Sequence, residues 1–305
     1  MIILCQNWVG KLFMGKIVGC GTALVTPFSD NFSVDYDSYR SLVKRQIESG
    51  VDFLVVLGTT AEVACLDLGE RIRLIEITLE EAGDVPVLVG VGTNCTQQVV
   101  DNIKKFELVA DYFGYLVVAP YYNKPNQHGL LLHYKTIANA TRKNIILYNI
   151  PGRTGININV VTVLQLLAQH RNIVGIKEAS SNYGQIGEII EKAPRDFVVL
   201  SGNDDDTLPL MAMGAKGVIS TVANLVPKQM KLLTQFCLTD DFKRARELHY
   251  RMRNLFVNCF KDTNPQPIKG AMAKLGLLKD ICRLPMVSAD EALVAQIVKN
   301  FEEIQ

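Results

Sequence analysis

The chain has 305 residues, with 32 Lys and Arg against 31 Asp and Glu and a formal net charge of +1. That length can bury one large core or two modest ones. Charges so nearly balanced, with no run of one sign, give no footprint for nucleic acid or for a membrane surface. No apolar run reaches the roughly 20 residues that a membrane span requires. We therefore expect a globular protein, with no nucleic acid and no membrane among its partners, that acts on a small molecule.

Cysteine and histidine spacing bears on redox setting and metal binding. The seven cysteines include no Cys-x-x-Cys pair, and an odd number cannot all pair within one chain, so a reduced, cytoplasmic setting is favoured. The four histidines lack the spacings typical of zinc sites. We predict no metal and no cofactor.

Eight short apolar, β-branched runs recur along the chain, and each ends in a cluster of polar residues, Gly or Pro. Such runs are typical of strands buried on both faces. They lie at residues 21–25, 53–57, 85–91, 115–119, 145–150, 173–176, 197–200 and 217–221. Segments with helical periodicity separate them, for example 36–49 and 69–82. Strands that alternate with helices indicate a parallel sheet.

Eight such units predict an α/β fold, a (β/α)8 TIM barrel over residues 16–238, with a doubly wound open sheet as the alternative. Beyond residue 224 the patterns are helical only, at 227–238, 241–260, 268–275 and 289–301. We expect a C-terminal helical subdomain over 239–305 that covers a barrel face or builds a subunit interface. Residues 1–15 lack the features of a signal peptide and are interpreted as an N-terminal extension.

In such a barrel the reactive groups follow the C-terminal ends of the strands. Lys177 directly follows the run 173–176, so its stem should begin within the barrel wall. Burial there disfavours the ammonium form, and a free amine can attack a ketone to form a Schiff base. From position alone, a lysine that extends to solvent at the rim is the alternative.

Hydroxyl groups follow three other strands. Tyr148 ends the fifth strand, while Thr59 and Tyr122 follow the second and fourth. A chain of hydroxyls can relay protons, although each such residue taken alone is more often a packing residue than a catalytic one. Thr59 and Thr60 also lie in a turn that begins with Gly, where backbone N–H groups suit a carboxylate. An ordinary helix-capping turn is the alternative.

Two more polar clusters follow strands five and seven. Arg153 projects from a tight turn, where its guanidinium suits a second carboxylate, unless it is simply a solvated loop arginine. Three successive acids at 204–206 predict the N-terminus of a helix rather than a metal site.

Together these segments resemble the dihydrodipicolinate synthase branch of the pyruvate-dependent lysine lyases, a superfamily that includes N-acetylneuraminate lyase. The resemblance runs from about residue 15 to residues 264–269, so it covers nearly the whole chain. It rests on five motifs in order: Gly58-Thr59-Thr60-Ala61-Glu62, Pro120-Tyr121-Tyr122-Asn123, Tyr148-Asn149-Ile150-Pro151-Gly152-Arg153-Thr154-Gly155, Gly175-Ile176-Lys177-Glu178 and Ser201-Gly202.

The resemblance implies that Lys177 forms an imine with pyruvate, whose carboxylate is held by Thr59 and Thr60. It also implies a proton relay of Tyr148, Thr59 and Tyr122. In this relay Tyr122 reaches in from a neighbouring subunit of a homotetramer, a dimer of dimers.

The resemblance further implies that Gly202 and Ile219 line the pyruvate pocket. Arg153 would bind the carboxylate of L-aspartate 4-semialdehyde, and it separates this branch from the sugar-acid lyases, which usually lack the Arg-Thr-Gly stretch. The implied reaction condenses the two substrates to 4-hydroxy-tetrahydrodipicolinate, on the diaminopimelate route to lysine.

Two departures from the family pattern carry expectations. Ala61 stands where the family usually has Gly, so the turn should shift if this position requires a positive φ. The family's lysine-regulated members carry acidic and histidine residues at positions that here are Gln98, Leu68 and Arg71, while Asn94 and Tyr121 are retained. We predict weak or absent inhibition by lysine.

Two other functions remain open from the sequence. A sibling lyase could use the same lysine imine to cleave N-acetylneuraminate or a keto-deoxy sugar acid. A catalytically silent barrel could serve as a binding or scaffold protein, although the intact lysine and hydroxyl residues argue against that reading.

Overall fold

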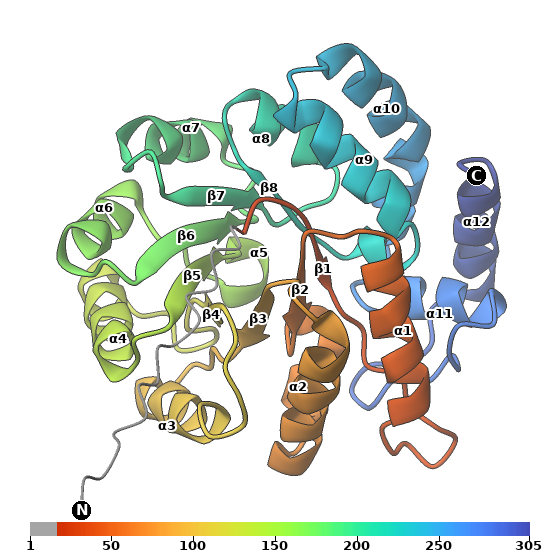
Figure 1. The fold of residues 1–305 in the computed structure, drawn as a ribbon, viewed down its shortest axis with the longest axis horizontal. Helices are drawn as coiled ribbons and strands as arrows, with labels where there is room; N and C mark the ends of the chain where they lie inside the picture. The colour runs from red at the N-terminus through yellow and green to blue at the C-terminus, as the bar shows by residue number, and fades with distance from the viewer. Residues whose placement is uncertain (1–16) are drawn as a thin grey trace, which may run out of the picture.

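The structure, a computed structural model, describes residues 17–305 and contains a closed barrel of eight parallel strands (Figure 1). Each strand pairs with the next in chain order, and β8 pairs with β1. The predicted TIM barrel is therefore confirmed, and the doubly wound open sheet is excluded. The strands are β1 (Gly19–Ala23), β2 (Phe53–Val56), β3 (Val87–Gly90), β4 (Gly114–Val118), β5 (Asn144–Asn149), β6 (Ile173–Glu178), β7 (Val198–Ser201) and β8 (Gly217–Ser220).

Two glycines form the seam where β1 meets β8. Gly19 and Gly217 are opposite each other in the register and have φ values of 92° and 154°. A Cβ built on Gly217 would lie 2.0 Å from the carbonyl oxygen of Gly19. Only glycine allows this approach of the two backbones, so these two residues permit the barrel to close.

Helices surround the barrel and follow the strands in sequence (Figure 1). Asp35 caps the first helix, and Asp67 and Glu70 form a reciprocal capping box at the second, which satisfies N–H groups that the helices leave free. The helices are α1 (Tyr36–Glu48), α2 (Leu68–Ala82), α3 (Thr96–Phe106), α4 (Gln127–Ala140), α6 (Val160–Gln169), α7 (Tyr183–Lys192), α8 (Thr207–Ala212) and α9 (Pro227–Leu238).

The core has two layers. The larger apolar cluster lies between the strands and the helices. A second, smaller cluster fills the barrel interior and is formed by Ile17, which precedes β1, and by residues of the strands: Ala23, Phe53, Val55, Leu88, Leu116, Ile146, Tyr148, Leu200 and Ile219. Because Ile146 pairs with Gly175 and Tyr148 pairs with Lys177, these two β6 residues also face the interior.

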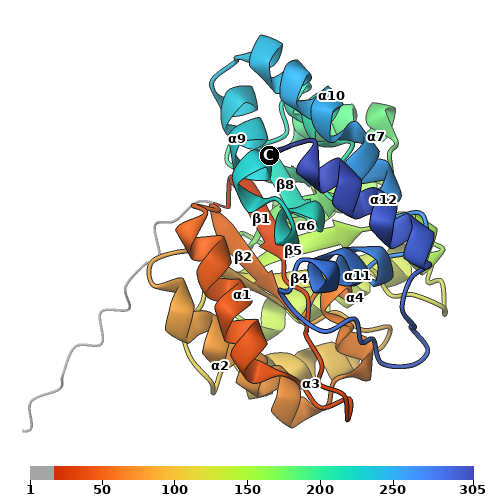
Figure 2. The ribbon, with the colours of Figure 1, turned by 90° about the vertical axis from the view of Figure 1, so that its right-hand side faces the viewer.

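Three further helices, α10 (Phe242–Asn258), α11 (Gln266–Lys274) and α12 (Glu291–Glu302), lie together on one side of the barrel (Figure 2). α10 packs on α9 and α12, and α11 packs on α12. The four helical segments predicted beyond residue 224 are therefore all present, each within three residues of its predicted bounds. The subdomain boundary at 239 remains a prediction, and the predicted extension 1–15 lies outside the described residues.

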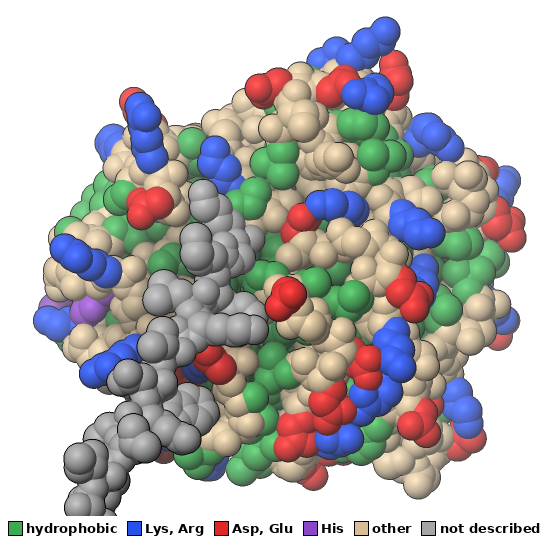
Figure 3. All heavy atoms as spheres, viewed as in Figure 1, with side chains coloured by type: hydrophobic (Ala, Val, Ile, Leu, Met, Phe, Trp, Pro, Cys, Tyr) green, Lys and Arg blue, Asp and Glu red, His purple; other side chains and the backbone are tan. Residues whose placement is uncertain are grey.

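The surface agrees with the balanced composition. Figure 3 shows acidic and basic side chains interspersed over one face of the molecule. In residues 17–305, no helix is long and apolar enough to cross a membrane.

Candidate active site

Lys177 lies in the last part of β6, and only 6% of its surface is exposed. It pairs with Tyr148 of β5, and its Nζ lies 4.4 Å from the centroid of the tyrosine ring. The strand therefore carries the amine into the barrel interior, as predicted, and not out to solvent at the rim. The Tyr148 side chain, 5% exposed, forms the wall beside it.

Gly202 leaves room for this lysine. Its N–H donates to the Glu178 carbonyl at 2.6 Å, which holds the end of β7 against β6. A Cβ at Gly202 would lie 2.6 Å from the Cβ of Ala179 and 3.0 Å from the Cε of Lys177. The absence of a side chain at Gly202 thus defines the space around the lysine stem.

The turn that carries Thr59 and Thr60 is a single 3-10 turn, η1 (Thr59–Ala61), after β2. The first N–H groups of such a turn have no partner within it, which leaves them free for an anion. The left-handed residues are Leu57, with φ of 59°, and Glu62, with φ of 53°. Ala61 is not among the residues with positive φ, so alanine is accommodated here without a shift of the turn.

A buried ion pair anchors this turn to the C-terminal helices. Lys269 of α11 donates to Glu62 at 2.6 Å, and both side chains are at most 1% exposed. The second carboxylate oxygen of Glu62 accepts the backbone N–H of Arg283 at 2.9 Å. On the barrel side, the Thr26 hydroxyl donates to the carbonyl of Ala61 at 2.8 Å. The conformation of the turn is therefore fixed from both sides.

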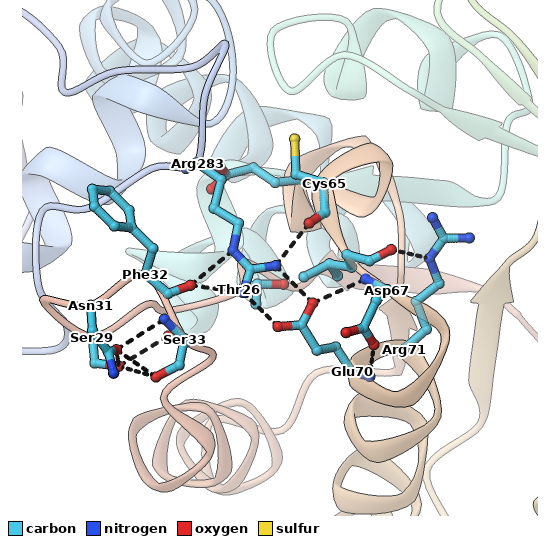
Figure 4. A network of polar contacts seen from close by, with 12 residues as sticks. Thr26, Ser29, Asn31, Phe32, Ser33, Cys65, Asp67, Glu70, Arg71 and Arg283 are labelled. Atoms are coloured by element: carbon cyan, nitrogen blue, oxygen red, sulfur yellow. Dashed lines mark hydrogen bonds and ion pairs between the residues drawn. The ribbon is translucent and has the colours of Figure 1, made fainter.

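Arg283 extends this anchor across three segments (Figure 4). Its guanidinium donates to the carbonyls of Phe32 and Cys65 and to the carboxylate of Glu70 at the start of α2. These hydrogen bonds lower the pKa of Glu70. The C-terminal segment thus holds the loops after β1 and β2 together beside the turn.

Two adjoining cavities meet at these residues. The inner cavity, about 90 Å³, is lined by Thr59, Thr60, Tyr148, Lys177 and Gly202 among others. The outer cavity, about 320 Å³, contains Arg153, Arg71 and Tyr121 in its lining. Both cavities share six lining residues: Gly58, Thr59, Leu116, Tyr148, Ile150 and Asn264. A ligand on Lys177 would therefore be in reach of a second ligand held near Arg153.

Arg153 lies in the short helix α5 (Pro151–Thr154), which Pro151 opens and Gly155 ends in a left-handed conformation. Its Nη2 donates to the backbone carbonyl of Asn264 at 3.3 Å and to the hydroxyl of Thr263 at 3.5 Å. Arg153 is exposed, and these two long hydrogen bonds connect its guanidinium to the C-terminal segment at the wall of the outer cavity.

Two predicted site residues do not line either cavity. Ile219 is buried in the barrel interior, in the same apolar cluster as Tyr148. Tyr122 has φ of 73° and is 87% exposed, in the loop after β4. Within one chain the structure therefore does not bring Tyr122 to Lys177.

The acids at 204–206 directly precede α8, as predicted, but no side-chain hydrogen bond caps that helix. Asp206 occupies the N-cap position without a side-chain capping bond, and its carboxylate accepts from Ser181 and Tyr183 instead. Asp204 is buried, accepts the backbone N–H groups of Thr221 and Val222, and has its pKa raised by burial to about 6. The predicted helix start is therefore confirmed, but the carboxylates bind partners distant in sequence and not the first turn of the helix.

Sequence reasoning also missed Asn264 and Lys269 as parts of the site. Their partners, Thr60 and Glu62, lie 204 and 207 residues away along the chain. The local sequence Asn-Pro-Gln-Pro-Ile-Lys resembles the family, but it does not indicate which residues these side chains contact.

Comparison with known proteins agrees with this fold. The sequence pattern of the Dihydrodipicolinate synthetase family matches residues 16–304. A 4-hydroxy-tetrahydrodipicolinate synthase of Phocaeicola vulgatus is 42% identical over 273 residues, which are 89% of this chain and 92% of the relative. The enzyme of the same name from Fervidobacterium nodosum is 43% identical over 94% of this chain and 98% of its own.

Solved structures agree. The crystal structure of dihydrodipicolinate synthase from Thermotoga maritima superposes with a TM-score of 0.91 at 42% identity, over 94% of this chain and 98% of the other. A monomeric dihydrodipicolinate synthase variant gives a TM-score of 0.92 at 42% identity, over 96% and 98% of the two chains. This chain therefore belongs to the dihydrodipicolinate synthetase family.

Proposed function

We propose that this protein is a 4-hydroxy-tetrahydrodipicolinate synthase that condenses pyruvate with L-aspartate 4-semialdehyde. The observation that carries the proposal is a buried lysine amine, Lys177, at the wall of a small cavity that is also lined by three threonines and a tyrosine. The names of the relatives, each matched over most of its length, support the same activity.

In the first step the Nζ of Lys177 attacks the ketone carbon of pyruvate. The resulting carbinolamine loses water and becomes an iminium, and loss of a proton from the methyl carbon then gives an enamine. Thr59 and Thr60, in the turn at the other wall of the inner cavity, hold the pyruvate carboxylate. Gly202 gives the adduct room, and Ile219 closes the barrel interior below it.

Proton transfer in these steps needs a relay. The ring of Tyr148 lies beside the amine, and Thr59 lies on the wall of the same cavity. We assign the third member to Tyr122 of a neighbouring subunit in a homotetramer, a dimer of dimers, because the exposure of this tyrosine leaves it available to another chain. Subunit exchange tests this assignment.

In the second step the enamine carbon attacks the aldehyde carbon of L-aspartate 4-semialdehyde, and the aldehyde oxygen takes a proton. Arg153, on the wall of the outer cavity, binds the carboxylate of this substrate. The substrate's own amino group then attacks the imine carbon and displaces Lys177. Ring closure releases the cyclic product and restores the free amine.

Borohydride reduction in the presence of pyruvate, followed by peptide mass mapping, tests the central step. The adduct is expected on Lys177 alone. Lys269 provides an internal control, because it is equally buried but paired with Glu62. An unmodified Lys177 peptide would refute the proposal, and pyruvate consumption on addition of L-aspartate 4-semialdehyde tests the second substrate.

Mixing two inactive variants tests the subunit arrangement. Lys177→Met lacks the amine and Tyr122→Phe lacks the relay hydroxyl, so neither should be active alone. If Tyr122 acts across an interface, mixed assemblies contain sites with both groups intact and recover activity. Mixtures that stay inactive after confirmed subunit exchange would contradict the assignment. The cytoplasmic location stays a prediction, which cell fractionation tests.

A further inference from the structure

Asn264 occupies the boundary between the two cavities. It lies in the segment between α10 and α11, is 5% exposed, and lines both the inner and the outer cavity. The C-terminal part of the chain thus contributes a polar side chain at the place where the two substrates of the proposed reaction meet.

The contacts of Asn264 leave one buried atom without a partner. Its Nδ2 donates to the hydroxyl of Thr60 at 2.9 Å, and its backbone carbonyl accepts from Arg153 at 3.3 Å. The side-chain oxygen Oδ1 accepts no hydrogen bond from residues 17–305. A buried acceptor left unsatisfied is costly, and native proteins keep few of them outside functional positions.

We propose that Oδ1 of Asn264 accepts a hydrogen bond from the α-amino group of the aldehyde substrate, which makes Asn264 a specificity-determining residue. The inference rests on the proposed function. In an α-amino acid the amino group and the carboxylate share one carbon atom. A substrate carboxylate held by Arg153 therefore places the amino group beside the residue whose backbone Arg153 contacts.

The carboxylate that lies near the substrate amino group already has hydrogen-bond partners. Among the residues that line the two cavities in the described chain, Glu62 is the only carboxylate, and its two oxygens accept from Lys269 and from the backbone of Arg283. A neutral amide oxygen is also the better partner for this chemistry. It orients the nitrogen by a hydrogen bond, yet it does not form the ion pair that would hold the amine in its protonated form.

Ring closure gives the position of Asn264 a further role. The amino group must leave the outer cavity and reach the imine carbon on Lys177, and Asn264 lines both spaces. A hydrogen bond at this boundary guides the nitrogen toward the carbon that it attacks. The same side chain holds the hydroxyl of Thr60, so it links the binding of the two substrates.

Steady-state kinetics with two aldehydes test the proposal. Succinic semialdehyde has the same chain without the amino group and serves as a competitive ligand. Asn264→Ala should raise the KM for L-aspartate 4-semialdehyde by about 10- to 100-fold, the effect of losing one hydrogen bond to a charged group. The inhibition constant of succinic semialdehyde should change by less than about threefold. Asn264→Asp keeps an acceptor and should retain the preference for the amino acid.

Asn203 is the matched control, because it lines the inner cavity while its side chain is bound to Ser181 and Asp206. Asn203→Ala should leave the ratio between the two aldehydes unchanged. If Asn264→Ala weakens the binding of both aldehydes equally, or raises only the KM for pyruvate, Asn264 acts solely through Thr60 and the inference is wrong. Failure of the wild-type protein to condense the two substrates would instead refute the proposed function.

Discussion

Replacing Gly202 with alanine should impair imine formation while leaving the fold intact. The new Cβ would lie 2.6 Å from the Cβ of Ala179 and 3.0 Å from the Cε of Lys177. Optimal carbon contacts are about 3.5–4.0 Å, so the Cε of Lys177 must move by roughly 0.5–1 Å and the Cβ of Ala179 by roughly 1–1.4 Å. The lysine stem is the more mobile of the two neighbours, and its displacement moves the amine away from the pyruvate ketone.

Overpacking of this kind costs about 1–3 kcal/mol. If the displacement of Lys177 carries that cost, the rate of imine formation falls by about 5- to 150-fold. Borohydride trapping at timed intervals after pyruvate addition measures this rate, and thermal unfolding reports whether the fold survives. Gly184→Ala is the matched control, because the nearest atom to its Cβ would be 3.6 Å away. Trapping as fast in Gly202→Ala as in the wild type would refute the reasoning.

Three other predictions follow from the charges and partners of buried groups. Lys269→Met should lower the free energy of unfolding in urea by about 3–5 kcal/mol, because it leaves Glu62 buried without its partner. Adding Glu62→Gln to this variant should recover part of that loss. An equal loss in the single and the double variant would contradict this prediction. Burial lowers the pKa of His133 from 6.5 to about 4, so the unfolded chain binds a proton that the folded chain does not. The free energy of unfolding should therefore fall by up to about 3 kcal/mol as the pH drops from about 6.5 to about 4. If the His133→Gln variant loses stability with pH as steeply as the wild type, another group is responsible. L-lysine should inhibit weakly or not at all in initial-rate assays, and half-maximal inhibition below millimolar lysine would overturn that expectation.

The fold was predictable because all eight strands are buried on both faces and read as continuous apolar runs. Their ends were less predictable. The first strand begins at Gly19, two residues before its predicted start, because its pairing with Gly217 of the distant eighth strand sets this end. The sixth continues through Lys177 and Glu178, since the carboxylate of Glu178 has buried donors in Asn149 and Gln185. A sequence displays the polarity of a residue but not its partner.

The residues of the candidate site also differ in how far the sequence predicts their positions. The barrel geometry makes the convergence of one group of site residues predictable from chain order, because they lie at the C-terminal ends of strands or directly after them: Lys177, Tyr148, Thr59, Thr60 and Gly202. Asn264 and Lys269 come from a helical region with no strand to place them, so nothing local in the sequence announces their contacts with the turn. The shift of the turn that Ala61 could have caused does not occur, because the residue with the left-handed conformation is its neighbour Glu62.

The dependence of the Thr59–Thr60 turn on Lys269 and Arg283 has a consequence during protein synthesis. A ribosome-bound chain that has emerged as far as α9 already contains all eight strands and the reactive lysine. It still lacks the groups that lock the turn, which lie in the stretch from Asn264 to Arg283. The nascent barrel is thus expected to meet pyruvate with an unformed carboxylate site, and it becomes competent for catalysis only when residues 264–283 fold onto it.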